Sequence, residues 1–371
     1  MEMDQSLAKN LLNNGAVLII TGVPIRTLFG VDLCTYTIAD NFRGVKMIPP
    51  GFHYVWCAAT GPYGDSAPRV GFAHYFKARE ILVKEWDATT EELKERQSPD
   101  PELEKQRIRE HLKDLDRFLA PYDLRCLKDW IKLTSHVVTE EVLNKCRPSL
   151  GTIRTNVELE SCPDSERPRG SLNETYSVMK LKFVSDENDL LPKLKPVEGT
   201  APRFNPVPDR VPKNSSPSEI SLHSVDCIEA CDELLKSYTN YLDLIQEIQL
   251  SFAFFVIGFS TESLLYWRKI LNLLSHSEEA AGKYLSLYGE YCKILAFQLP
   301  HLPEELSMPT EGNTVYKDVR SLLYNLKRVG LENSGNLLIK SLEKSLNWKF
   351  DNLKEDPEDM PVVVELDEAM E

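Results

Sequence analysis

Apolar and polar residues follow two different periods along this chain of 371 residues. Between residues 16 and 86, short runs either alternate at every second position or are apolar throughout, and glycine and proline separate them. Such runs are typical of β-strands, and the run at 16–21 is apolar on both faces, as in a fully covered central strand. From residue 101 onwards, apolar residues recur at helical spacing. We therefore expect about six strands in a β-sandwich-like domain, followed by helices.

The stretch FRGVKMIPPGFHYVW, residues 42–56, organises the predicted β-domain. Its first strand-like run ends at Pro49, because proline cannot donate a backbone hydrogen bond to a neighbouring strand. Pro50 and Gly51 then suit a type II turn, which splays the flanking strands. We expect a corner between two sheets at this point. After the turn, alternation places Phe52, Tyr54 and Trp56 on one face and His53, Val55 and Cys57 on the other.

Helices are expected at both ends of the strand region. A short opening helix is predicted at 7–13, with Gly15 past its end. Two apolar stripes and a short helix at 140–145 form a helical appendage that we expect to pack on the β-domain. The first stripe comprises Ile108, Leu112, Leu115 and Leu119; the second comprises Leu124, Leu127, Ile131 and Thr134, with Trp130 beside it.

A proline-rich segment separates this region from the C-terminal half. Prolines at positions 163, 168, 192, 196, 202, 206, 208 and 212 exclude long helices. One run, at 177–184, has strand character. We interpret residues 162–215 as a linker that returns a strand to the first domain.

The C-terminal half predicts only helices. Residues 216–219, SPSE, have the pattern of a capping box with proline at the first helical position. A run at 244–259 is apolar nearly all round and therefore belongs at the centre of a bundle. The predicted fold class is α+β with two domains, a β-sandwich-like N-terminal domain with appended helices and an all-α antiparallel helical C-terminal domain. The boundaries are 1–161 for the first domain, 162–215 for the linker, 216–355 for the helical domain and 356–371 for an acidic tail.

The amino-acid composition argues against several classes of function for this chain. The chain carries 43 lysines and arginines against 57 aspartates and glutamates, a net charge of −14, which argues against a general nucleic-acid-binding surface. The opening residues, MEMDQSLAKN, lack the features of a secretory signal, and the apolar run at 250–259 is too short to span a bilayer. The eight cysteines contain no C-x-x-C pair, so we expect reduced, mostly buried thiols. The composition favours a soluble intracellular protein.

No catalytic motif is present. The sequence lacks G-x-G-x-x-G, Walker A, G-x-S-x-G and H-E-x-x-H motifs and any paired Cys/His metal spacing. We therefore expect no enzyme activity, no catalytic residue, no cofactor and no metal. The seven histidines are interpreted as structural or solvent-facing. The pair Cys227 and Cys231 has the same structural interpretation. Arg43 and Lys46 are interpreted as outward-facing positions and not as a phosphate clamp. The carboxylates of Glu91, Glu92, Glu102 and Glu104 are interpreted as solvated residues at helix starts.

The tail contains a strand-forming segment in an acidic setting. Residues 351–371 include nine acidic residues and one lysine, around PVVVEL at 361–366. An isolated strand is not stable there, because burying a valine contributes ~1.5–3 kcal/mol while ordering each residue costs ~1–2 kcal/mol. A disordered acidic tail is one alternative. The other is addition of a strand to an existing sheet edge, its own or a partner's, through Val362, Val363, Val364, Glu365 and Leu366.

Several motifs, in a fixed order, resemble a known family. They are FGVD at 29–32, NFRGVKMIPPGFHY at 41–54, LDRFLAPY at 115–122, LKDWIKLT at 127–134, the helical block at 252–278 and PVVVEL at 361–366. Together they span nearly the whole chain, with the poorest match at 149–215. They resemble the a1-alpha2-repression splicing-factor family.

The resemblance implies a non-enzymatic assembly chaperone of the U5 small nuclear ribonucleoprotein in pre-mRNA splicing. Such a protein is expected to bind the RNase H-like and endonuclease-like domains of the central spliceosomal scaffold protein and to block premature helicase docking. Its expected location is the cytoplasm and the nucleus, without direct contact to nucleic acid or membrane. The residues at 362–366 match the motif expected to extend a scaffold sheet. Phosphorylation is the expected release signal, and Ser216, followed by Pro217, is a candidate phosphosite.

Two other function classes compete with this interpretation. A helical adaptor from membrane trafficking, binding peptides or membrane headgroups, would need a basic or aromatic groove on the helices, which the net charge disfavours. An enzyme would have to use His53 and His74 of the β-domain together with scattered carboxylates.

Overall fold

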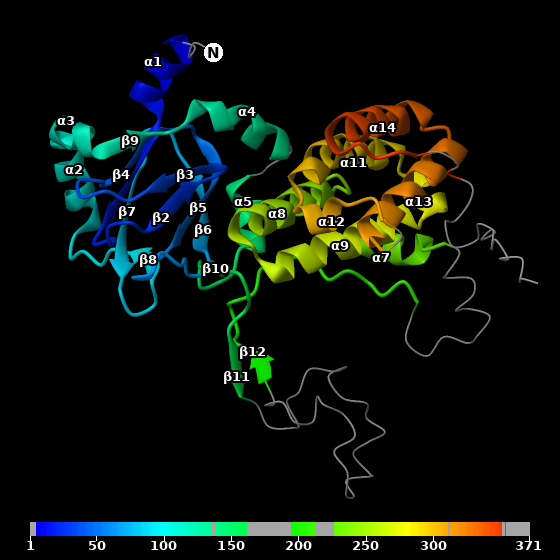
Figure 1. The fold of residues 1–371 in the computed structure, drawn as a ribbon, viewed down its shortest axis with the longest axis horizontal. Coiled ribbons are helices and arrows are strands. Elements are labelled where there is room, and N and C mark those ends of the chain that lie inside the picture. Colours follow the sequence, from blue (N-terminus) through cyan, green and yellow to red (C-terminus); the bar gives the residue numbers. More distant parts are fainter. Residues whose placement is uncertain are drawn as a thin grey trace, which may run out of the picture. The chain divides into compact units, whose positions relative to one another are not determined.

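The structure, a computed structural model, describes residues 5–134, 139–161, 194–211, 226–310, 312–350 and 353. The chain divides into two compact units. Unit 1 comprises Met1–Phe204 together with Ala253–Leu264, and unit 2 comprises Asn205–Phe252 together with Leu265–Glu371. Unit 1 contains the sheets, and the described part of unit 2 is helical (Figure 1). The predicted α+β class with a β-rich N-terminal domain and a helical C-terminal domain is confirmed.

Two five-stranded sheets form the centre of unit 1, in the orders β8-β7-β1-β4-β9 and β10-β6-β5-β2-β3. The pairs β1–β7 and β4–β9 are parallel, and the other pairs within these sheets are antiparallel. The strands are β1 (Ala16–Thr21), β2 (Leu28–Val31), β3 (Cys34–Thr37), β4 (Gly44–Ile48), β5 (Gly51–Ala58), β6 (Val70–Phe76), β7 (Ile81–Asp87), β8 (Glu92–Glu95), β9 (Leu119–Pro121) and β10 (Ile153–Arg154).

The sequence pattern predicted the long strands and the four-residue β3, and it missed four other short strands. All six predicted strands are present, but β2, β8, β9 and β10 were not predicted, and each has four residues or fewer. Alternation over so few residues is too short to stand out from a loop. As predicted, β1 is a central strand, paired on both sides and apolar on both faces.

The predicted corner at Pro49 and Pro50 is confirmed. Strand β4 lies in the first sheet and β5 in the second, so the chain passes from one sheet to the other at this turn. Gly51, the first residue of β5, has a φ of 133°, which is accessible to glycine at little cost. The turn therefore joins two sheets instead of closing a hairpin.

Strand β5 is covered on both faces. Its inner face adds Val55 and Cys57 to the core between the sheets, which also contains Leu18, Phe29 and Phe76. On the outer face, three aromatic residues follow one another at every second position, as the alternation predicted. Phe52 packs on Trp130 with ring centroids 5.2 Å apart, Tyr54 packs on Phe254 at 5.9 Å, and the Arg69 guanidinium lies 3.8 Å from the centroid of Trp56.

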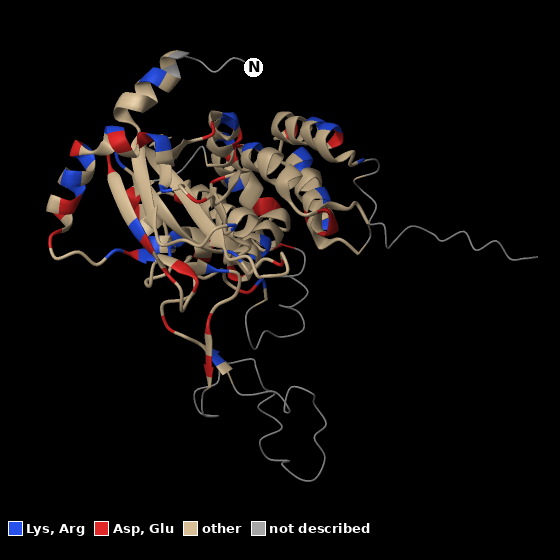
Figure 2. Cartoon of the chain, turned by 60° about the vertical axis from the view of Figure 1, so that its left-hand side comes forward, with Lys and Arg blue, Asp and Glu red and all other residues tan. Residues whose placement is uncertain are grey.

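The helices of unit 1 cover the sheets. They are α1 (Gln5–Asn14), α2 (Pro101–Glu110), α3 (Leu112–Leu115), α4 (Leu124–Leu133) and α5 (Glu140–Cys146), so the opening helix and the short helix near 140 are confirmed. The Gly15 N–H donates to the Leu11 carbonyl at 2.7 Å and ends α1 as expected. The charged residues of the strands are concentrated on β7 and β8, and α2 carries both signs (Figure 2).

The first helical stripe packs on the β-domain as predicted, but it ends earlier. Ile108, Leu112 and Leu115 contact a cluster formed by Val17 and its neighbours on the first sheet. The prediction that Leu119 continues the helix was wrong, because this residue begins β9 and pairs in parallel with Gly44 of β4. The backbone there forms sheet hydrogen bonds, which outweigh the local helical period.

The second stripe is confirmed in part. Leu124 and Leu127 pack against the core between the sheets, as predicted, but Ile131 is 54% exposed, and Trp130 and Leu133 are the buried residues of α4. The Trp130 indole N–H donates to the Phe52 carbonyl at 3.0 Å, which turns this side of the helix towards β5. A large indole with a satisfied donor therefore takes the place predicted for Ile131.

The described part of the linker contains one strand, which does not join either large sheet. Strand β12 (Leu194–Pro196) pairs antiparallel with β11 (Leu159–Ser161) in a separate two-stranded ribbon (Figure 1). The strand predicted at 177–184 and the capping box at 216–219 lie outside the described residues.

The C-terminal half contains the predicted succession of helices. Trp267, Leu271, Leu322, Leu326 and Leu342 are buried, as their stripes require. None of the described helices is long and apolar enough to cross a bilayer. The helices are α7 (Ile228–Lys236), α8 (Asp243–Gly258), α9 (Thr261–Ser275), α10 (Glu278–Lys283), α11 (Leu285–Gln298), α12 (Glu304–Ser307), α13 (Thr314–Arg328) and α14 (Glu332–Leu346).

A buried carboxylate connects the second sheet to β9. The Asp32 side chain accepts hydrogen bonds from the Tyr54 backbone N–H at 2.9 Å and the Tyr122 hydroxyl at 2.6 Å, and lies 2.6 Å from Nδ1 of His53. His53 Nε2 lies 2.7 Å from the Pro49 carbonyl oxygen. Burial, and then the charge of Asp32, raise the pKa of Tyr122.

We predict that Asp32→Asn destabilises the protein by about 3 kcal/mol, because the amide removes the negative charge and replaces one of the two acceptor oxygens with an NH2 donor. Either the Tyr54 N–H, or the Tyr122 hydroxyl and His53, then face a donor. Asparagine tolerates the positive φ of 55° at this position, so backbone strain does not confound the result. Tyr122→Phe, which removes one donor only, should cost about 1 kcal/mol. Urea unfolding measures both; equal losses would contradict the central role of the carboxylate.

A pair of glycine substitutions tests the outer face of β5. Gly258 ends α8, and a Cβ there would overlap the buried Tyr54 hydroxyl, so Gly258→Ala should destabilise by about 1–3 kcal/mol. Gly289, inside α11, is the matched control, because its nearest neighbour, Ser334 Oγ, lies 3.9 Å from an added Cβ. Gly289→Ala should stabilise by roughly 1 kcal/mol. Thermal unfolding that gave the same sign for both variants would exclude this packing.

Candidate binding pocket

The residues predicted to bind a partner lie outside the described part of the chain. These are Val362, Val363, Val364, Glu365 and Leu366 of the tail, together with the candidate phosphosite Ser216. Their roles stay predictions. The candidate chemistry that the structure does describe lies in unit 1.

The two histidines of the β-domain are each held by a different carboxylate. His53 is 2% exposed and contacts Asp32, as described above. His74 Nε2 lies 2.8 Å from Glu80 Oε1, and the other Glu80 oxygen accepts from the Lys77 backbone N–H. Although burial acts to raise it, these hydrogen bonds lower the pKa of Glu80. In the described structure neither ring forms a hydrogen bond with a serine, threonine or cysteine, so the arrangement is structural.

The other residues considered for chemistry also have structural partners. Lys46 pairs with Asp116 at 2.6 Å, while the Arg43 guanidinium donates to the Phe42 carbonyl, so the two do not form a clamp. Cys231 is fully buried, with its Sγ 3.1 Å from Ser277 Oγ. Six of the seven described cysteines are buried, as expected for most of them.

The prediction for Glu92 was wrong. Glu102 and Glu104 do lie in the first turn of α2, but Glu92 begins strand β8 and is 6% exposed. Its carboxylate lies 2.8 Å from Arg154 Nη2 and 3.3 Å from Lys94 Nζ. These two cations compensate the negative charge of the buried Glu92 carboxylate. Their spacing from Glu92 in the sequence did not indicate that they would lie beside it.

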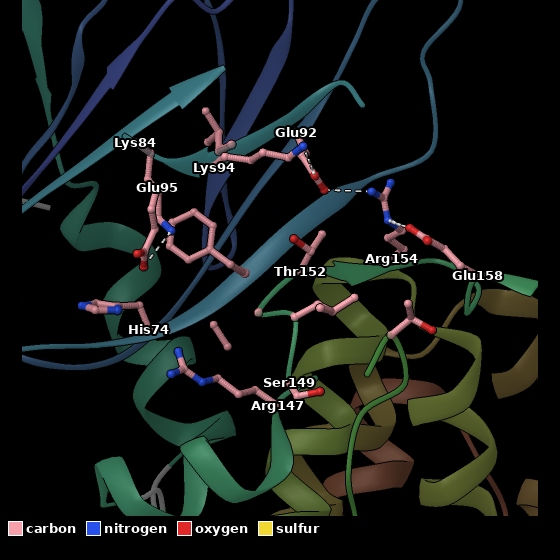
Figure 3. Close-up of a pocket in the computed structure, with 16 residues that line it drawn as sticks. His74, Lys84, Glu92, Lys94, Glu95, Arg147, Ser149, Thr152, Arg154 and Glu158 are labelled. Atoms are coloured by element: carbon pink, nitrogen blue, oxygen red, sulfur yellow. Dashed lines mark hydrogen bonds and ion pairs between the residues drawn. The ribbon is translucent and has the colours of Figure 1, made fainter. Parts of the chain in front are cut away.

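Glu92 lines a pocket of about 530 Å³ in unit 1 (Figure 3). The pocket is bounded by β6, β7 and β8, by the segment 147–154 and by Thr200. Four lysine or arginine side chains and three glutamates line it, so charged groups dominate its chemistry. The cations are Lys84, Lys94, Arg147 and Arg154, and the anions are Glu92, Glu95 and Glu158.

The two ends of the pocket differ in charge compensation. At one end, Arg154 bridges Glu92 and Glu158, with Nε 2.9 Å from the latter. At the other end, Lys84, His74 and Arg147 lie near one another (Figure 3). Lys84 is 9% exposed, and its ammonium is 4.6 Å from the centroid of the Phe72 ring. Burial lowers the pKa of Lys84; Glu95 opposes this effect, and Arg147 reinforces it.

A second group of chemically active side chains lies between β3 and α4. The Sγ atoms of Cys34 and Cys126 and a carboxylate oxygen of Asp123 lie within 4.8 Å of one another. Both Asp123 oxygens already bind the Arg125 guanidinium, at 2.7–3.1 Å, and Arg125 lowers the pKa of Asp123. Burial raises the pKa of the Cys34 thiol, which disfavours the thiolate that a metal needs. This arrangement does not favour a metal site.

Comparison with known proteins gives matches along the whole chain. Residues 14–148 match the family profile described as AAR2 N-terminal domain, and residues 204–351 match the AAR2 C-terminal repeat region. The chain is similar to the Protein AAR2 homolog of Mus musculus, with 32% identity over 100% of this chain and 99% of the relative. The Homo sapiens homolog is 30% identical over the same shares, and that of Caenorhabditis elegans is 31% identical over 80% of this chain and 81% of its own.

Both units are therefore matched by models of one family, and relatives align over nearly their full length. The chain belongs to the AAR2 family, the splicing-factor family that its sequence motifs resemble.

Proposed function

We propose that this chain is a non-enzymatic assembly factor of the U5 small nuclear ribonucleoprotein in pre-mRNA splicing. In this proposal it covers the RNase H-like and endonuclease-like domains of the central spliceosomal scaffold protein and keeps the helicase from docking prematurely. It acts in the cytoplasm and the nucleus and is released before the particle matures. The observation that carries the proposal is the AAR2-family match to both units.

The described chemistry supports a binding function over a catalytic one. The histidines that an enzyme of the β-domain would need are each paired with a carboxylate, and His53 is sealed from solvent. Most of the charged side chains of the pocket are paired with one another. Such groups hold a surface in shape and do not supply a proton acceptor to a substrate.

Two compact units suit a partner with two domains. Each unit has its own buried core, so each can present a formed surface to one domain of the scaffold. Joining two binding surfaces in one chain makes the second contact intramolecular, which raises overall affinity without new contacts. The tail adds a third contact in this proposal. Its valines would supply backbone hydrogen bonds to a sheet edge, and its acidic residues would favour a basic groove.

The tail contact is tested by substitutions that change the backbone donor and little else. Val363→Pro and Val364→Pro each remove one N–H, and in an added strand one of the two N–H groups faces the partner sheet. One of these variants should therefore bind the scaffold fragment about tenfold more weakly, because a lost ladder bond and the distorted strand cost about 1.4 kcal/mol or more. Calorimetric titration measures the affinity.

Val363→Thr and Val364→Thr are the matched controls, because threonine keeps both the N–H and the β-branched shape. They should bind nearly as well as the unchanged chain, and none of the variants should alter the thermal unfolding temperature. Deletion of the residues after Asp359 should weaken binding at least as much as the stronger proline variant. A deletion that leaves the affinity unchanged contradicts the tail contact, and absence of any binding by the full chain contradicts the proposed function.

A further inference from the structure

At the His74 end of the pocket, the neighbouring carboxylates do not compensate all of the positive charge. Lys84 has one carboxylate within ion-pairing distance, Glu95 Oε1 at 3.7 Å. The Glu95 side chain is 87% exposed, so water screens this contact and it stabilises the ammonium weakly. Lys84 is nevertheless only 9% exposed as a residue, so its side chain has lost most of its contact with water.

Arg147 brings a second cation to the same place. It follows α5 directly, and its backbone carbonyl accepts from Arg203 Nε at 2.9 Å. Its guanidinium forms no ion pair with a carboxylate in the described part of the chain. Figure 3 shows the Arg147 and Lys84 side chains and His74 at one side of the cavity, with Ser149 and Thr152 also lining it.

We propose that this end of the pocket binds a phosphate group between Lys84 and Arg147. A dianion between the two cations compensates both, whereas the single exposed carboxylate of Glu95 reaches only Lys84. A guanidinium fork suits two phosphate oxygens, and an ammonium supplies a point charge to the third. The phosphate is either that of a phosphorylated side chain or that of a free phosphorylated molecule.

The size of the cavity and the charge of the chain make the site selective. About 530 Å³ accommodates a phosphate together with the group that carries it. The net charge of −14 repels anions from the surface at large, so binding depends on the local pair of cations. This inference does not depend on the proposed function, because it rests on the pocket alone.

Thermal unfolding in the presence of phosphate is the first test. Inorganic phosphate should raise the Tm of the unchanged chain more than sodium chloride of equal ionic strength does, and the rise should saturate. Phosphate also stabilises proteins by exclusion from their surface, but that effect is common to all variants. The specific part is therefore the difference between the unchanged chain and Arg147→Gln, which should bind about tenfold more weakly.

Arg107→Gln is the matched control. Arg107 is an exposed residue of α2 outside the pocket, so its loss changes the net charge by the same amount and should leave the phosphate response intact. Equal responses in Arg147→Gln, Arg107→Gln and the unchanged chain would overturn the proposal.

Lys84→Met separates a binding role from a structural one. It replaces a poorly paired buried ammonium with an apolar chain of similar length, so without ligand the Tm should stay equal or rise. With phosphate, the specific response should disappear. A variant that folds and still responds like the unchanged chain overturns the proposal; Arg147→Gln, whose side chain forms no described ion pair, provides the same test if Lys84→Met does not fold.

The Glu95→Gln variant is expected to change the phosphate affinity in the opposite direction. Removing the carboxylate that competes for Lys84 should tighten phosphate binding several-fold, because a negative charge beside the ammonium no longer repels the phosphate. Weaker binding in this variant would contradict the proposed position of the phosphate.

The two sources of phosphate are distinguished by a peptide. An acetylated, amidated Gly-phosphoserine-Gly peptide and its unphosphorylated form are titrated beside inorganic phosphate. Tighter binding of the phosphopeptide than of inorganic phosphate assigns the site to a phosphorylated protein segment, and equal or weaker binding assigns it to a free phosphorylated molecule. Binding of the unphosphorylated peptide with equal affinity would exclude phosphate recognition.

Discussion

Unit 1 depends on a strand that has no solvent face. Strand β5 runs through the second sheet with its inner residues in the core between the sheets and its outer aromatic residues under α4 and the segment Ala253–Leu264. In an open β-sandwich the outer face of each sheet is exposed to solvent, so polar residues can alternate with apolar ones along a strand. Here Phe52, Tyr54 and Trp56 are covered by Trp130, Phe254 and the Arg69 guanidinium, in that order.

The polar groups of the same region are arranged so that this burial is possible. Asp32 satisfies the Tyr54 N–H and the Tyr122 hydroxyl, and His53 fills the remaining space between Asp32 and the Pro49 carbonyl. A buried carboxylate without these donors would be strongly destabilising. The network thereby ties the corner, the second sheet and β9 to one arrangement, because Asp32 follows β2, His53 and Tyr54 belong to β5 and Tyr122 follows β9.

The sequence predicted what local periodicity can determine. The long strands, the corner at Pro49 and Pro50, the opening helix and the helical C-terminal half follow from alternation, proline and helical spacing. The errors arose where a distant partner decides the local structure. Leu119 pairs with β4, the indole of Trp130 turns α4 so that Ile131 is exposed, and Glu92 is buried by Arg154, which lies 62 residues further along. The pocket around Lys84 could not be predicted from the sequence for the same reason, because Lys84 and Arg147 lie in separate segments of the chain.

The membership of α8 in both units has a consequence for how the chain folds during synthesis. Its residues up to Phe252 belong to unit 2, while Ala253–Gly258 belong to unit 1 and cover Tyr54. The ribosome therefore releases the sheets of unit 1 long before the segment that shields them. At about 5–20 residues per second, the interval between residue 161 and residue 264 lasts several seconds, which is long compared with strand pairing. During that time the outer aromatic residues of β5 lack the cover that Phe254 gives them in the folded chain.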